Sequence, residues 1–253
     1  MLNYVEYGKE NKYDDDIFFQ KYSQMSRSQQ GLAGAGEWET LRKLLPDFKD
    51  KRVLDLGCGY GWHCIYAMEH GASSVVGVDI SHKMLEVAKE KTHFPQVEYK
   101  CCAIEDVEFP EESFDVILSS LAFHYVADYE ILVKKIYRIL KSGGKLVFTV
   151  EHPVFTAYGT QDWYYNEKGE ILHFPVENYY YEGKRTAVFL GEKVTKFHRT
   201  LTTYLNTLLS NGFIINHIVE PQPPENMMDI PGMRDEMRRP MMLIVSANKK
   251  VDR

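Results

Sequence analysis

The sequence predicts an α/β fold in which helices cover both faces of a mostly parallel sheet. Strand-like and helix-like segments alternate from residue 51 to about 151, as they do in successive βαβ units. The apolar segment 53–56 runs into a turn of alternating glycines, and the apolar segment 75–78 ends in Asp79. Such turns and strand ends lie at the carboxyl edge of an open α/β sheet, where ligands bind.

The individual elements follow from apolar periodicity and from residues typical of helix ends. In the first part of the chain, we expect strands at 51–56, 74–79, 96–101, 114–119 and 145–150, and helices at 60–70, 84–91 and 129–140. Ser81 and Asp128 are placed to cap two of these helices, and the Ser-Gly-Gly sequence at 142–144 is expected to form a turn. Further along, we expect a helix at 200–210, strands at 213–219 and 241–247, and a proline-rich surface loop at 221–240.

Residues 152 to about 195 hold a dense set of aromatic side chains, interrupted by turn signals at 166–169 and 182–184. Short strands or hairpins are therefore expected here rather than a long helix. This aromatic-rich segment would be a small cap insertion after the fifth strand, over the carboxyl edge of the sheet. Its aromatic side chains would line a small-molecule pocket, form the core of a small subdomain, or do both.

Length and composition limit the possible partners. The chain has 253 residues, of which 44% are hydrophobic, and this is enough for one domain with a sizeable core. The formal net charge is −6 and no block of Lys and Arg stands out, so neither nucleic acid nor a membrane is expected as a partner. No apolar run approaches the roughly 20 residues of a membrane span, and the polar, acidic amino terminus is not a secretory signal. The chain has four cysteines, which we expect to be free thiols in the reducing cytoplasm: Cys58, Cys64, Cys101 and Cys102.

The glycine turn and Asp79 together predict a nucleoside-containing cofactor. A carboxylate at the end of the second strand can accept hydrogen bonds from both hydroxyls of a ribose. The turn lacks the third glycine of a dinucleotide fingerprint, because Trp62 stands at that position. Asp55 places a negative charge beside the turn, which disfavours a pyrophosphate and favours an ammonium group. The alternative is an ordinary glycine turn between a strand and a helix.

Three segments resemble motifs of the class I S-adenosylmethionine-dependent methyltransferases, in the small-molecule branch that includes the type 11 and ubiquinone-biosynthesis-like enzymes. They are D-x-G-x-G-x-G at 55–61, F-P-x-x-S-F-D at 109–115 and R-x-L-K-x-G-G at 138–144. Ser142 stands in the third segment where proline is usual, and this change should affect only the turn. The resemblance, strong over about 20–151, implies a Rossmann-like seven-stranded sheet whose last strand is antiparallel to its neighbours.

The resemblance further implies S-adenosyl-L-methionine as the cofactor and a set of residues that bind it. The glycines would line its methionine and ribose portion, Asp79 would bind the ribose, and apolar side chains would flank the adenine. Ala103 stands where this family commonly has an acid, so a side-chain contact to the adenine amine is in doubt there. The candidate cofactor-binding residues of the core are Asp55, Gly57, Cys58, Gly59, Gly61, Asp79, Ile80, Ile104, Glu105 and Ser119.

The amino-terminal segment 1–45 is expected to form a helical lid over the cofactor. Within it, Tyr22 or Arg27 would bind the carboxylate of the cofactor, because a guanidinium matches a carboxylate with two parallel hydrogen bonds. The alternative for Arg27 is a surface position.

Three residues near the predicted active edge are candidates for proton removal. His124 has a side chain whose ordinary pKa of about 6.5 suits a general base, although a structural role is the alternative. Glu151 and His152 end the fifth strand side by side and could orient or deprotonate an amine or a hydroxyl. No residues have the spacing of metal ligands, so no metal is expected.

We interpret the chain as a cytoplasmic, monomeric or homodimeric enzyme that transfers a methyl group to nitrogen or oxygen of a small molecule by in-line displacement. The alternatives are a non-catalytic S-adenosylmethionine-binding regulatory protein and, less favoured, an NAD(P)-dependent oxidoreductase. One domain would span 1–253, with the lid at 1–45, the cofactor-binding core at 46–151, the cap insertion at 152–198 and the C-terminal part of the sheet at 199–253.

Overall fold

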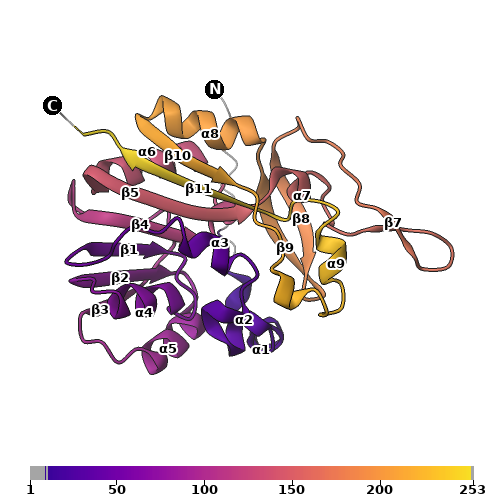
Figure 1. Ribbon diagram of the computed structural model, residues 1–253, viewed down its shortest axis with the longest axis horizontal. Coiled ribbons are helices and arrows are strands. Elements are labelled where there is room, and N and C mark those ends of the chain that lie inside the picture. The colour runs from indigo at the N-terminus through magenta and orange to yellow at the C-terminus, as the bar shows by residue number, and fades with distance from the viewer. Residues whose placement is uncertain (1–8, 10, 252–253) are drawn as a thin grey trace.

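A seven-stranded sheet forms the centre of the protein (Figure 1). The computed structural model describes residue 9 and residues 11–251, so the first residues of the expected lid, 1–8 and 10, lie outside the described part. The strands of the sheet are β1 (Arg52–Leu56), β2 (Ser74–Asp79), β3 (Val97–Cys101), β4 (Phe114–Ser120), β5 (Leu140–Glu151), β10 (Phe213–Val219) and β11 (Met242–Lys249).

The order of the strands is β10-β11-β5-β4-β1-β2-β3. Strand β11 runs antiparallel to both β10 and β5, whereas β1 to β5 pair in parallel. The predicted Rossmann-like sheet is therefore confirmed, including the antiparallel last strand between its neighbours. Parallel pairing brings the carboxyl ends of β1, β2 and β4 to the same edge of the sheet, where the glycine turn and Asp79 also lie.

Helices cover both faces of the sheet because side chains alternate along each buried strand. Leu54 and Leu56 of β1 belong to one buried layer, and Val53 belongs to the other. A register slip of one residue would exchange these side chains between the layers, so burial on both faces fixes the register. The helices are α6 (Tyr129–Ile139) and α8 (Leu201–Ser210) in the first layer, and α3 (Trp38–Arg42), α4 (Trp62–Glu69) and α5 (His82–Lys91) in the second. Among the described residues, no helix is both long and apolar enough to cross a bilayer.

The structure departs from the predicted elements at two places. Strand β5 begins at Leu140 rather than at 145, and the expected turn at 142–144 lies within it as an irregularity. Phe114 pairs with Leu140 whereas Val116 pairs with Lys145, so the extra residues of β5 are accommodated as a bulge. The expected loop at 221–240 contains two short helices, η4 (Glu225–Met227) and α9 (Met233–Glu236).

The lid and the cap lie next to each other over one end of the sheet (Figure 1). Phe18 of lid helix α1 is fully buried and packs with Ala187 and Val194 of the cap hairpin. The lid elements before α3 are η1 (Lys12–Asp14), α1 (Asp16–Ser23), α2 (Ser26–Gln29) and η2 (Gly31–Gly34). The cap consists of α7 (Pro153–Ala157) and two hairpins, formed by β6 (Tyr164–Tyr165) with β7 (Ile171–His173) and by β8 (Gly183–Phe189) with β9 (Glu192–His198).

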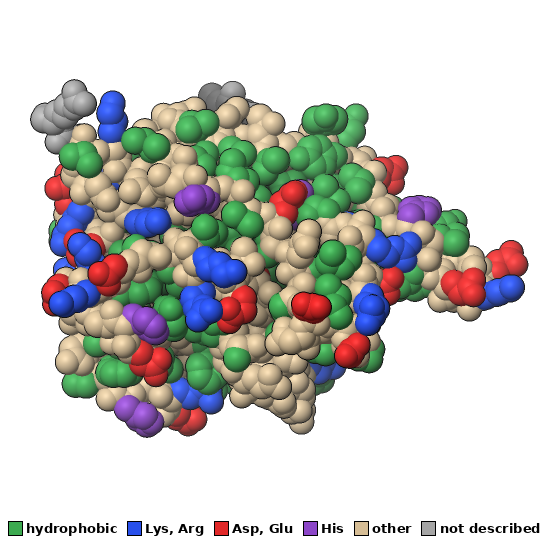
Figure 2. Space-filling view, viewed as in Figure 1, with side chains coloured by type: hydrophobic (Ala, Val, Ile, Leu, Met, Phe, Trp, Pro, Cys, Tyr) green, Lys and Arg blue, Asp and Glu red, His purple; other side chains and the backbone are tan. Residues whose placement is uncertain are grey.

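The hairpin of β6 and β7 projects from the body of the protein as an arm (Figure 1), and acidic and basic side chains gather at its outer end (Figure 2). The hairpin of β8 and β9 instead packs against the lid, so this second hairpin helps to close the carboxyl edge of the sheet.

Candidate functional site

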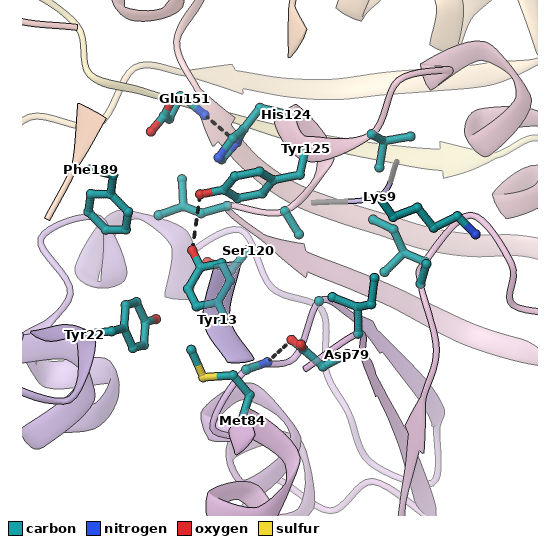
Figure 3. Close-up of a pocket in the computed structure, with 18 of the residues that line it drawn as sticks. Lys9, Tyr13, Tyr22, Asp79, Met84, Ser120, His124, Tyr125, Glu151 and Phe189 are labelled. Carbon is teal, nitrogen blue, oxygen red and sulfur yellow. Dashed lines mark hydrogen bonds between the residues drawn. The ribbon is translucent and has the colours of Figure 1, made fainter. Parts of the chain in front are cut away.

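A cavity of about 210 Å³ opens at the carboxyl edge of the sheet, between the lid and the cap. By the measure of roughly 15 Å³ for each water molecule, it has room for about a dozen waters and hence for an organic ligand. Asp79 lines one end of the cavity, and His124 and Glu151 line the other (Figure 3).

The carboxylate of Asp79 is held at the end of β2 by two backbone donors. Gly59 N donates to Oδ2 at 2.8 Å, and Ser81 N donates to Oδ1 at 2.9 Å. Burial raises the pKa of Asp79, although these two hydrogen bonds oppose the shift. Each carboxylate oxygen can accept more than one hydrogen bond, so Asp79 retains acceptor capacity toward the cavity.

The glycines of the first turn have different local environments. Gly59 has a φ of 52°, and a Cβ added there would meet no atom within 4 Å, so its backbone is open to a ligand. A Cβ added at Gly61, where φ is 75°, would come within 2.2 Å of the hydroxyl of Tyr99. Gly57 and Gly59 line the cavity, whereas Gly61 lies outside the lining and is required for packing at the start of α4.

Several other predicted cofactor residues also line the cavity. Ile80 follows β2, and Ile104 and Glu105 follow β3, so their side chains lie on the same side of the cavity as Asp79. Burial raises the pKa of Glu105. Ala103 lines the cavity beside Ile104 and supplies no carboxylate, as expected from its place in the sequence.

Asp55, Cys58 and Ser119 do not line this cavity, and their predicted contact with the ligand stays a prediction. Asp55 is buried on β1, where Cys64 Sγ donates to its Oδ2 at 3.5 Å, and burial raises its pKa to about 7. Ser119 donates its hydroxyl hydrogen to Leu56 O at 2.7 Å, and the next residue, Ser120, lines the cavity instead. Side chains alternate in direction along a strand, so Ser119 and Ser120 face opposite sides. The position of the strand end alone does not tell which of the two faces the cavity.

Cys58 lines a smaller neighbouring cavity of about 80 Å³. This cavity shares Gly57, Gly59 and Ser120 with the larger one and also reaches the lid. Cys58 is a buried free thiol, and burial raises its pKa well above the ordinary range.

The lid contributes Tyr13, Tyr22, Met25 and Arg27 to the cavity wall. Arg27 Nη2 lies 3.0 Å from both carboxylate oxygens of the buried Glu37, so Arg27 is part of an internal ion pair. Tyr22 and Arg27 line both cavities.

The lid is fixed to the core through the start of α5. Ser81 donates its hydroxyl hydrogen to Asp14 Oδ1 at 2.6 Å and accepts a hydrogen bond from Met84 N at 3.1 Å. Tyr13, the residue before Asp14, is thereby positioned to reach Tyr125 across the cavity, where the two hydroxyl oxygens are 3.2 Å apart (Figure 3).

The far end of the cavity, which we call the acceptor end, is lined by Tyr125, Phe189, His124 and Glu151. Glu151 N donates to His124 Nδ1 at 3.3 Å (Figure 3). Burial lowers the pKa of His124 to about 4, so its imidazole is neutral near pH 7. Burial alone would raise the pKa of Glu151. Its pKa is lowered instead by electrostatic interaction with His124 where that ring is protonated, by the charge of Lys196, and by the hydrogen bonds from Lys196 and Gln161.

His152 does not line the acceptor end beside Glu151, and its catalytic role stays an untested prediction. Consecutive residues of an extended chain point in opposite directions. His152 Nδ1 accepts from Val154 N at 3.1 Å and caps α7, and its Nε2 lies 2.9 Å from Glu220 Oε1. Burial lowers the pKa of His152.

Sequence reasoning missed Tyr13 and Met25 of the lid, Lys196 of the cap, and Met241 and Met242 near the start of β11. All of these except Lys196 line the cavity, and Lys196 donates to the Glu151 carboxylate. The sequence did hold a signal for Lys196, because it is two residues from the buried Val194 and so lies on the same face of the strand. The others depend on how distant segments pack together.

The cavity fits the adenosyl group expected from the sequence. Gly59 leaves its backbone open, Asp79 offers acceptor capacity at the end of β2, and Ile80 and Ile104 supply apolar surface nearby. A ribose and a flat aromatic base need this combination of a hydrogen-bond acceptor and apolar walls.

Comparisons with known proteins agree with this geometry. A family model described as a methyltransferase domain matches residues 54–148. The chain is 34% identical over 250 residues to an uncharacterised protein of Haemophilus influenzae, and the alignment covers 94% of the chain and 96% of that protein. No activity follows from this relative alone.

Two crystal structures assigned to the S-adenosylmethionine-dependent methyltransferases share both fold and sequence with the chain. The protein from Listeria monocytogenes is 57% identical, with a TM-score of 0.83, covering 87% of this chain and 99% of that one. The protein from Mesorhizobium loti is 40% identical, with a TM-score of 0.80, covering 86% of this chain and 100% of that one. The chain therefore belongs to the S-adenosylmethionine-dependent methyltransferases, and it is an enzyme whose cofactor is S-adenosylmethionine.

Proposed function

We propose that the enzyme methylates an oxygen or nitrogen atom of a small molecule that binds at the acceptor end of the cavity. The observation that carries this proposal is the continuity of one cavity from Asp79 and Gly59 to His124 and Glu151. A donor and an acceptor bound at its two ends would meet inside a single cavity, which is the arrangement that a direct transfer requires.

The residues proposed to hold the cofactor are those of the Asp79 end. Asp79 would accept the ribose hydroxyls, the backbone at Gly57 and Gly59 would allow close approach, and Ile80 and Ile104 would flank the adenine. When bound, S-adenosylmethionine supplies a methyl group on a positively charged sulfur, which keeps the electron pair of the broken carbon–sulfur bond.

Arg27 is proposed to bind the carboxylate of the methionine portion. Its Nη2 is paired with Glu37, but a guanidinium carries five N–H donors and can bind a second carboxylate at the same time. Glu37 would orient Arg27 and balance part of its charge, and Tyr22 would close the same wall.

The acceptor end supplies two groups of different hydrogen-bonding character. His124 Nδ1 accepts a hydrogen bond from Glu151 N, so the neutral imidazole carries its hydrogen on Nε2 and acts there as a donor. Glu151 is the hydrogen-bond acceptor, and its carboxylate would take the proton that a hydroxyl loses as it is methylated. We therefore propose Glu151, rather than either histidine, as the proton acceptor.

The partial cover that the lid and the cap form over the site supports a small-molecule substrate. Lid residue Tyr13 contacts Tyr125 across the cavity, and lid helix α1 packs against the hairpin of β8 and β9. A macromolecular substrate would have to displace this cover, whereas a small molecule fits beneath it. The four cysteines, which are free thiols, support the further proposal that the enzyme works in a reducing compartment such as the cytoplasm.

Transfer of a labelled methyl group tests the proposal. Wild-type enzyme with tritiated S-adenosylmethionine should label the small-molecule fraction of a metabolite extract, and labelling of only the protein or RNA fraction would contradict it. Glu151→Gln should lose most of this transfer while S-adenosylhomocysteine still binds. Glu220→Gln is the matched control, because the Glu220 carboxylate lies beside His152 and outside the cavity lining.

A further inference from the structure

Lys196 is a buried cation directly behind the acceptor end. The residue is only 2% exposed, and it lies on β9 of the cap rather than on the sheet. Its Nζ donates to Glu151 Oε1 at 2.5 Å and to Gln161 Oε1 at 2.9 Å. Removing an ammonium from water is costly, so such a group is found buried only where nearby acceptors offset the cost.

The surroundings of Lys196 provide that compensation. In addition to Glu151 and Gln161, Nζ lies 5.4 Å from the ring centre of Phe189 and 6.0 Å from that of Tyr125. Aromatic faces at such distances attract cations. Phe189 and Tyr125 also line the acceptor end, so the ammonium and the substrate would contact the same two rings from different sides.

Gln161 is the second side chain that holds the Glu151 carboxylate. Its Nε2 donates to Glu151 Oε2 at 2.6 Å while its Oε1 accepts from Lys196, so each oxygen of Glu151 is held by a different donor. Gln161 adopts a φ of 60°, a backbone conformation that non-glycine residues rarely take and that often marks functional sites. The cap thus supplies both of the side chains that orient Glu151.

The charged and titratable side chains around Glu151 come from several elements. They are His124 and Tyr125 from η3 (Phe123–Tyr125), Lys196 from β9, Arg199 just beyond β9, and the adjacent His152 with Glu220. Arg199 donates to the backbone carbonyls of Val126 and Ala127, and His124 presents Nδ1 to a backbone amide. Lys196 is therefore the cation that forms the direct ion pair with the Glu151 carboxylate.

We propose that Lys196 is a positioning residue that keeps Glu151 ionised and aimed into the acceptor end, so that Glu151 can take the proton of the methyl acceptor. This inference rests on the proposed function. A hydroxyl oxygen becomes strongly acidic as it gains the methyl group, so a weakly basic carboxylate is sufficient to remove its proton. The proton moves to Glu151 and the acceptor leaves as an uncharged methyl ether or ester. Acceptors of this class carry a hydrogen on the nucleophilic oxygen.

Carbon-13 NMR of protein labelled at the glutamate carboxyls tests the charge state without any acceptor. The resonance of Glu151 is identified by its loss in Glu151→Gln. In the wild type it should titrate below the ordinary glutamate range, and in Lys196→Gln its midpoint should rise by at least about one pH unit. Lys196→Arg should restore a low midpoint, and Lys193→Gln, an exposed lysine on the same strand, should leave it unchanged.

A wild-type midpoint in Lys196→Gln would overturn the proposal. If Lys196→Gln does not fold, a wild-type Glu151 that titrates at or above the ordinary glutamate value would also overturn it. Once methyl labelling has identified the acceptor, kcat/KM can be measured as a function of pH. The acidic limb of this profile should lie at higher pH in Lys196→Gln than in the wild type. In Lys196→Arg it should return to the wild-type position. Failure to find any acceptor would count against the proposed function, whereas an unshifted acidic limb would count against Lys196 alone.

Discussion

Replacement of Asp79 by alanine is the perturbation with the clearest expected size. The Asp79 carboxylate already accepts one backbone hydrogen bond on each oxygen, from Gly59 N and Ser81 N. Two ribose hydroxyls would add two hydrogen bonds to a charged group, each worth about 1.5–3 kcal/mol. Because burial makes the ionised form of Asp79 less favourable, we take the lower value for each bond. Asp79→Ala should therefore weaken cofactor binding by about 3 kcal/mol, which is roughly a hundredfold.

Isothermal titration calorimetry with S-adenosylhomocysteine measures this loss. A further comparison, of adenosine with its dideoxy analogue, distinguishes loss of the ribose contact from a general loosening of the turn at Gly59. Wild-type enzyme should bind adenosine more tightly than 2′,3′-dideoxyadenosine, and Asp79→Ala should bind the two with nearly equal affinity. Glu98→Ala is the control, because Glu98 is an exposed carboxylate on the neighbouring strand β3.

Two results would refute this reasoning. Wild-type affinity for S-adenosylhomocysteine in Asp79→Ala would show that the carboxylate makes no net contribution to binding. An undiminished preference for adenosine in the variant would show that another group recognises the ribose hydroxyls.

Two further predictions concern the buried side chains of His124 and Arg239. His124, whose pKa is lowered to about 4 by burial, should show no titration of its ring protons by NMR between pH 8 and 5, and a midpoint near 6.5 would contradict its burial. Since the unfolded chain binds this proton near pH 6.5, His124 should make the folded state less stable as pH falls from about 6.5 toward 4. Arg239→Ala should reduce the free energy of unfolding by about 2 kcal/mol, because the buried guanidinium contacts three aromatic rings. Arg238→Ala, which removes a more exposed guanidinium over Trp163 alone, should cost less in the same urea unfolding measurement, and equal losses would contradict the role of the three rings.

The sheet and the Asp79 end of the site could be predicted because their signals are local. Buried parallel strands have continuous apolar sequences, and the glycine turn and Asp79 follow β1 and β2 directly along the chain. Ser120 rather than Ser119 lines the cavity, and of the adjacent Glu151 and His152 only Glu151 does so. Both cases concern the direction of a side chain at the end of a strand, and that direction depends on where pairing ends and the chain turns.

The acceptor end could not be fully predicted because distant segments build it. Tyr13 reaches Tyr125 only because Asp14 binds Ser81 at the start of α5. Lys196 reaches Glu151 only because the cap folds back over the end of β5. Such contacts between residues far apart in the sequence leave little trace in local composition or periodicity.

A crystal structure of the enzyme with S-adenosylhomocysteine tests the central claim most directly. The account predicts that the ribose hydroxyls bind the Asp79 carboxylate, that the adenine lies between Ile80 and Ile104, and that the sulfur faces the end lined by His124 and Glu151. A ribose bound away from Asp79, or a sulfur directed away from Glu151, would contradict it.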